Sequence, residues 1–96
     1  DFYILMNNKV YLQLGSNMGD RDAYLKNTID FIAEEIGEIQ KKSKIYESAP
    51  WGIENQNNYL NQALEIKTDL SAEEVLDGVL KIEDKTIILV LPSLNY

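Results

Sequence analysis

The spacing of apolar residues changes several times along the chain, and this succession restricts the folds that the chain can adopt. Residues 10–14 alternate between apolar and polar or aromatic positions, which is the period of a strand with one buried face. Residues 20–36 place apolar side chains at helical spacing, and Gly37 supplies a stop signal. We therefore expect a first strand, a turn at residues 15–17 and a first helix.

The middle of the chain predicts two more strands. Residues 39–46 alternate weakly and end at the turn-forming segment 49–52, Ala-Pro-Trp-Gly. In residues 59–66 the apolar side chains of Leu60, Leu64 and Ile66 share one face, and Tyr59, Asn61 and Ala63 share the other. The sequence thus predicts a second strand, a loop and a third strand that has a polar face.

The last third of the chain predicts a second helix and a fourth strand. Ser71 and Glu74 have the spacing of a capping box, and apolar residues follow them at helical intervals. Residues 86–91 are apolar or β-branched throughout, which favours a buried strand that ends before Pro92. The order βαββαβ is that of a ferredoxin-like α+β fold, an antiparallel sheet with two helices on one face. Residues 1–96 fit a single domain.

Composition narrows the possible chemistry. The chain has no cysteine and no histidine, so disulfides, cysteine-based zinc sites and histidine bases are excluded. Its net charge is −7, and Arg21 is its one arginine, which argues against nucleic acid as a partner. Its apolar runs are too short to cross a membrane. We expect a cytoplasmic protein without nucleic-acid or membrane partners.

Three segments contain candidate binding residues. The turn at Gly15 could present backbone amides to a ligand, or be an ordinary connection. Tyr59 and Asn61 leave the same strand face, where a ring and an amide could hold a flat heterocycle or merely cover the sheet. Ser48 and Trp51 belong to a loop that could line a pocket, or Trp51 could cap the edge of the core.

Three motifs, taken in order, resemble the 6-hydroxymethyl-7,8-dihydropterin pyrophosphokinase family of folate synthesis. Residues 10–21, Val-Tyr-Leu-Gln-Leu-Gly-Ser-Asn-Met-Gly-Asp-Arg, are similar to its opening strand and turn. Residues 45–52 resemble its Tyr-x-Thr-x-Pro-x-Gly loop, and residues 59–63 resemble its (Tyr/Phe)-Leu-Asn-x-Ala strand. The resemblance covers about residues 10–83 and implies the same ferredoxin-like fold.

The resemblance also implies a function and its residues. The family transfers pyrophosphate from ATP to the pterin hydroxymethyl oxygen and releases AMP, with Mg²⁺ held by an Asp-x-Asp pair. By this similarity Tyr59 would stack on the dihydropterin and Asn61 and Ser48 would hydrogen-bond its ring. Gly15 and the backbone of Trp51 would complete the pocket. Glu83 would lie towards ATP.

The chain departs from the family pattern after residue 85. An arginine-rich loop and the Asp-x-Asp strand are expected there, but residues 86–92 read Thr-Ile-Ile-Leu-Val-Leu-Pro. We expect that this part of the sequence is incomplete, and that residues 1–5 are a foreign leader before Met6. We also expect that these 96 residues alone are inactive, because phosphoryl transfer needs metal and cationic groups. An inactive pterin-binding module, or a ferredoxin-like module for another ligand, is the alternative.

Overall fold

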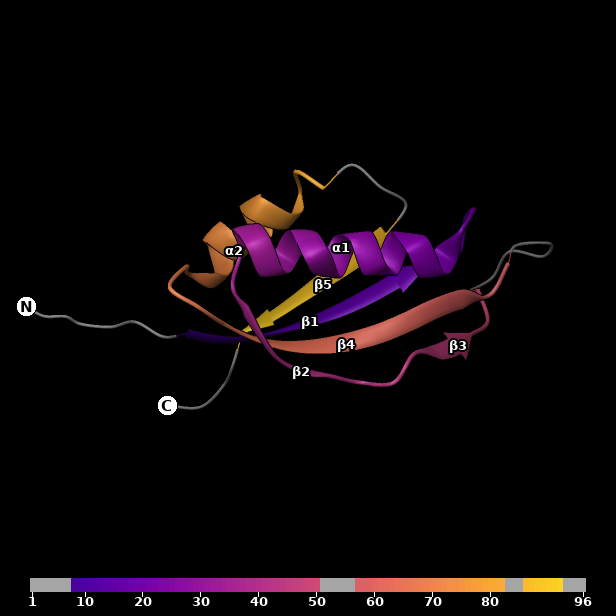
Figure 1. Cartoon of the computed structure of the whole chain (residues 1–96), viewed down its shortest axis with the longest axis horizontal. Helices are drawn as coiled ribbons and strands as arrows, with labels where there is room; N and C mark the ends of the chain where they lie inside the picture. Colours follow the sequence, from indigo (N-terminus) through magenta and orange to yellow (C-terminus); the bar gives the residue numbers. More distant parts are fainter. Residues whose placement is uncertain (1–7, 51–56, 83–85, 93–96) are drawn as a thin grey trace, which may run out of the picture.

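The computed structural model describes residues 8–50, 57–82 and 86–92, which form one antiparallel sheet and two helices (Figure 1). In chain order the elements are β1 (Asn8–Ser16), α1 (Arg21–Glu35), β2 (Glu38–Lys42), β3 (Tyr46–Ser48), β4 (Tyr59–Thr68), α2 (Ala72–Val79) and β5 (Thr86–Pro92). None of the helices in these ranges is long and apolar enough to cross a membrane.

The strand order is β2-β4-β1-β5, and β3 pairs with β4 beyond the end of β2. Every pairing is antiparallel, so β1 and β2 run parallel with β4 between them, and β4 and β5 run parallel with β1 between them. Both helices cover the same face of the sheet (Figure 1). These two interlocked split βαβ units confirm the ferredoxin-like α+β fold expected from the sequence.

The side chains of the two central strands, β1 and β4, alternate between a buried face and an open face of the sheet. Val10, Leu12 and Leu14 of β1, and Leu60, Leu64 and Ile66 of β4, are buried under the helices. They pack with Leu25 and Ile32 of α1 and with Val75 and Val79 of α2 in one core. Tyr11, Gln13 and Gly15, with Tyr59, Asn61 and Ala63, lie on the opposite face, which neither α1 nor α2 covers.

Both helices begin at side chains that satisfy free backbone amides. Asp20 Oδ1 accepts the amide hydrogen of Ala23 at 3.1 Å, which caps α1. Ser71 Oγ accepts from Glu74 N at 3.1 Å, and Glu74 Oε1 accepts from Ser71 N at 2.9 Å. The predicted capping box of α2 is therefore confirmed.

The second predicted strand is two strands in the structure. β2 ends at Lys42 and β3 begins at Tyr46. Between them, Ser43 Oγ accepts the amide hydrogen of Ala63 at 2.9 Å, while Ser43 N donates to Ala63 O, also at 2.9 Å. A side-chain oxygen thus takes one place in the hydrogen-bond ladder of β4, and the backbone leaves the regular strand there.

Two other expectations about the strands are wrong. Gly15 and Ser16 are the last residues of β1, not a turn, because β1 pairs on both sides as far as Ser16. The fourth predicted strand, β5, lies at the sheet edge and includes Pro92, which an edge strand tolerates. Its outward side chains Ile87, Leu89 and Leu91 are 55–57% exposed, since the helices cover only one face.

Candidate functional site

Four of the residues singled out in the sequence meet on the open face where β1, β3 and β4 lie side by side. Gly15 of β1 is paired with Asn61 of β4, and Ser48 of β3 is paired with Tyr59 of β4. The strand register therefore brings three segments that are far apart in the sequence to one end of the sheet.

The Asn61 side chain links β4 to β3. Its Nδ2 donates to Ser48 Oγ at 2.8 Å and to the backbone oxygen of Tyr46 at 3.3 Å. Because Nδ2 donates to two protein acceptors, Asn61 Oδ1 is left to accept, and the Ser48 hydroxyl keeps a hydrogen to donate. An acceptor and a donor thus lie next to each other at the surface of the site.

Gly15 allows the side chains of β4 to lie close over β1. A Cβ atom at Gly15 would lie 3.1 Å from Asn61 Oδ1 and 3.4 Å from Tyr59 Cδ1. The first distance is tighter than ordinary van der Waals contact, so any larger residue would push Asn61 outward. Because Gly15 has no side chain, the Asn61 side chain can lie close to the backbone of β1.

Two further residues of this face, Tyr46 and Gln13, were not singled out in the sequence. Gln13 Nε2 of β1 donates to Tyr46 Oη of β3 at 2.8 Å. Since β4 lies between these strands, the tyrosine side chain crosses β4 to reach the glutamine. The signal in the sequence was the alternation of Tyr46 with Ser48, which places both on one strand face.

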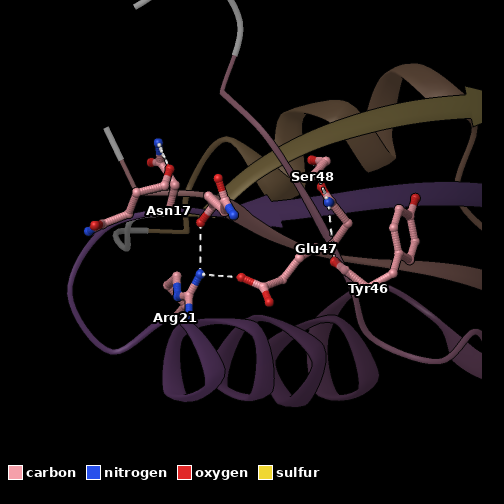
Figure 2. A network of polar contacts seen from close by, with 8 residues as sticks. Asn17, Arg21, Tyr46, Glu47 and Ser48 are labelled. Carbon is pink, nitrogen blue, oxygen red and sulfur yellow. Dashed lines mark hydrogen bonds and ion pairs between the residues drawn. The ribbon is translucent and has the colours of Figure 1, made fainter. Parts of the chain in front are cut away.

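On the helix side of the same strands, Arg21 makes a second set of contacts (Figure 2). Its Nη1 donates to the backbone oxygen of Asn58 at 2.9 Å and lies 3.3 Å from Glu47 Oε2. Asn17 Nδ2 donates to the backbone oxygen of Asn57 at 3.4 Å. The start of α1 is thus linked to the residues on both sides of the β3–β4 connection.

A shallow hollow lies farther along the open face and does not include these four residues. Tyr11, Gln13, Lys41, Ala63 and Leu91 are among the residues that line it. The lining is mostly apolar, in contrast to the amide and hydroxyl groups around Asn61. We therefore place the candidate site at Asn61 and not in the hollow.

The described residues do not supply a complete set of magnesium ligands. They contain no cluster of three or more carboxylates, and Mg²⁺ requires oxygen ligands. Beside Gly15, where β5 reaches the candidate site, the residue in register is Ile87, followed on the same face by Leu89 and Leu91. These side chains offer no ligand atoms. Trp51 and Glu83, also expected at the site, lie outside the described residues.

The structure so far defines a ferredoxin-like domain with a small polar site on its uncovered sheet face. Residues 11–87 match the model of the 7,8-dihydro-6-hydroxymethylpterin-pyrophosphokinase family. The chain therefore belongs to this family, as the three sequence motifs predicted.

Individual relatives agree with this assignment. The chain is 50% identical over 74 residues to the 2-amino-4-hydroxy-6-hydroxymethyldihydropteridine pyrophosphokinase of Aquifex aeolicus, a match over 77% of this chain and 46% of that protein. It is 42% identical over 81 residues to the protein of the same name from Bacillus subtilis, over 83% of this chain and 48% of that protein. The chain thus spans about half the length of these curated relatives.

Proposed function

We propose that the protein transfers pyrophosphate from ATP to 6-hydroxymethyl-7,8-dihydropterin and releases AMP, as a step of folate biosynthesis. The observation that carries this proposal is the meeting of Gly15, Ser48, Tyr59 and Asn61 at one end of the open face, in a chain that belongs to the pyrophosphokinase family. Since ATP would be the donor, the proposal places the reaction in the cytoplasm.

In this proposal the described residues bind and orient the pterin. The Tyr59 ring stacks on the flat heterocycle. Asn61 Oδ1 accepts from a ring N–H group, and the Ser48 hydroxyl donates to a ring acceptor, because the Asn61–Ser48 hydrogen bond leaves those two groups available. Gly15 lets the ring edge approach the sheet. Trp51 contributes its backbone.

The reaction itself joins the pterin hydroxymethyl oxygen to the β-phosphorus of ATP. The bond from that phosphorus to the oxygen of the α-phosphate breaks, AMP leaves with that oxygen, and the hydroxyl proton is lost to solvent or a base. Holding the hydroxymethyl group in one place is what the residues around Asn61 contribute, and such orientation lowers the entropic part of the barrier. Glu83 is proposed to lie on the ATP side.

Calorimetric titration with 6-hydroxymethyl-7,8-dihydropterin tests the site. Asn61→Ala should weaken binding by about 1–3 kcal/mol, or roughly five- to 150-fold, because ring donors lose their acceptor. Gln40→Ala is the matched control, since it removes an exposed amide from β2, away from the site. Equal affinities of the Asn61 variant and the unchanged protein would contradict the proposed role.

A second candidate, pterin binding without transfer, is favoured for these 96 residues by the apolar row Ile87, Leu89 and Leu91 beside the site. AMP release would be assayed with ATP, Mg²⁺ and the dihydropterin, for this chain and for a polypeptide extended by a complete family-like C-terminal part. We expect binding by both and AMP release only by the longer one. Comparable turnover by the two would overturn the second candidate.

A further inference from the structure

Arg21 contacts both ends of the segment that joins β3 to β4. Glu47, the middle residue of β3, lies before the connection, and Asn58 comes directly before β4. One guanidinium nitrogen, Nη1, reaches both: it lies 3.3 Å from the Glu47 carboxylate and donates to the Asn58 carbonyl at 2.9 Å (Figure 2). A single side chain of α1 therefore links β3 to the residue that precedes β4.

The two partners of Arg21 are each adjacent in sequence to a residue of the candidate site. Glu47 precedes Ser48, and Asn58 precedes Tyr59. Glu47 is in register with Leu60, which is buried on the helix side, whereas Ser48 and Tyr59 belong to the open face. Arg21 therefore lies behind the site and acts on its residues only through the backbone.

The β3 strand depends on such support more than the other strands do. It has three residues, all of them exposed, and β4 is the strand with which it pairs. A short edge strand with no buried side chain frays readily, because little apolar surface resists its opening. A hydrogen bond from a charged donor to a carbonyl is stronger than one between neutral groups, so the Asn58 contact restrains the start of β4.

We propose that Arg21 is a positioning residue of the pterin site, which sets the places of Ser48 and Tyr59 by anchoring the two ends of the β3–β4 connection to α1. This inference rests on the proposed function. The guanidinium does not touch the ligand. Its effect on affinity is preorganisation: without the anchor, part of the binding free energy is spent on ordering the two strand ends.

The test compares Arg21→Met with Lys26→Met. Both variants remove one positive charge from α1, but Lys26 is exposed and lies one turn away. Binding of 6-hydroxymethyl-7,8-dihydropterin would be measured by calorimetry, and backbone amide exchange would be followed along the chain. Arg21→Met should weaken binding about tenfold and speed exchange in β3 and at the start of β4, while Lys26→Met should change neither.

A conservative variant separates positioning from general stability. Arg21→Lys keeps the charge and can still donate to Asn58 or Glu47, so it should recover most of the affinity that Arg21→Met loses. If Arg21→Met does not fold, the same two measurements on Glu47→Gln and Arg21→Lys decide. The inference requires that β3 is better ordered with the Arg21 anchor than without it. It does not require that the anchor slows pterin release.

The outcomes that overturn the inference are specific. Pterin affinity of Arg21→Met equal to that of the unchanged protein or of Lys26→Met would overturn it, and so would faster exchange spread evenly over β1, β2 and β4. If the unchanged protein binds no dihydropterin, the proposed function fails. The exchange data then test the anchor alone. Faster exchange of Arg21→Met confined to β3 and the start of β4 supports the anchor, and unchanged exchange overturns it.

Discussion

The two faces of the sheet are built from the same strands but differ in what their side chains do. On the helix side, β1 and β4 contribute aliphatic residues that are almost fully buried. On the open side, the neighbouring residues of β1 and β4 contribute to a polar site around Asn61. The outward residues of β5 form an apolar row on the same side. Residues adjacent in sequence, such as Asn61 and Gln62, therefore face different surroundings.

Under the proposed function, the two-residue period of the strands separates the residues that stabilise the fold from those that bind the pterin. Substitutions on the helix side should alter the free energy of unfolding, and substitutions on the open side near Asn61 should alter pterin affinity. The open face itself is divided, because the outward side chains of its β5 part, Ile87, Leu89 and Leu91, are apolar. Four substitutions test this separation, in order of expected effect.

The largest effect is expected for Leu64→Ala on the helix side. Leu64 is 1% exposed in the core, so the change should lower the free energy of unfolding by about 2–5 kcal/mol through lost burial and the cavity left behind. Urea denaturation measures it. Leu89→Ala removes the same atoms from a position that is 57% exposed. A loss at Leu89 as large as that at Leu64 would contradict the difference between the faces.

Gly15→Ala should act on the open side. The added methyl group would lie 3.1 Å from Asn61 Oδ1 and would push the Asn61 side chain outward, while its distance of 3.4 Å to Tyr59 Cδ1 is ordinary contact. We expect about tenfold weaker pterin binding by calorimetry, equivalent to about 1.4 kcal/mol, and a smaller change in the free energy of unfolding. Unchanged affinity together with lower stability would assign Gly15 to the fold and not to the site.

Ser71→Ala should lower stability by about 1 kcal/mol without changing pterin affinity, because it removes the cap of α2 on the helix side. Thermal and urea denaturation would show the effect. Glu74→Gln is the matched control, since glutamine can still accept from Ser71 N in a capping box. A loss in Glu74→Gln with none in Ser71→Ala would show that charge at the helix start, and not the hydroxyl cap, stabilises α2.

The smallest effect is expected for Leu89→Thr on the open face of β5. The side chain is exposed and threonine suits a strand, so the free energy of unfolding should change by less than about 0.5 kcal/mol. Urea denaturation of this variant, beside Leu64→Ala, completes the comparison. A loss above 2 kcal/mol would mean that another part of the protein covers this row.

The sequence predicted the fold because β1, β4 and α2 have strong local signals. Alternation defined β1 and β4, and the capping box defined the start of α2. The candidate site was predicted from Gly15, Ser48, Tyr59 and Asn61, which the strand register brings together, although their binding roles remain predictions.

Other features depend on contacts between distant residues. Ser43 Oγ takes the place of a backbone acceptor for the Ala63 amide of β4, and no local pattern signals this. The edge position of β5 follows from the strand order, whereas its composition alone favoured a buried strand. The contacts of Arg21 join residues 26 and 37 positions apart, so charge and spacing within the helix gave no indication of them.

The strand order has a consequence for how the protein folds. β1 pairs with β4 and β5, and neither is its neighbour in sequence, so the central pairing closes a loop of more than forty residues. Chains dominated by such distant pairings have a high contact order and fold more slowly than helical proteins of similar size. Gly15 meets Asn61 only once this pairing has formed. The candidate site should therefore form late and in one step with the sheet, and a nascent chain cannot assemble it until β4 has been synthesised.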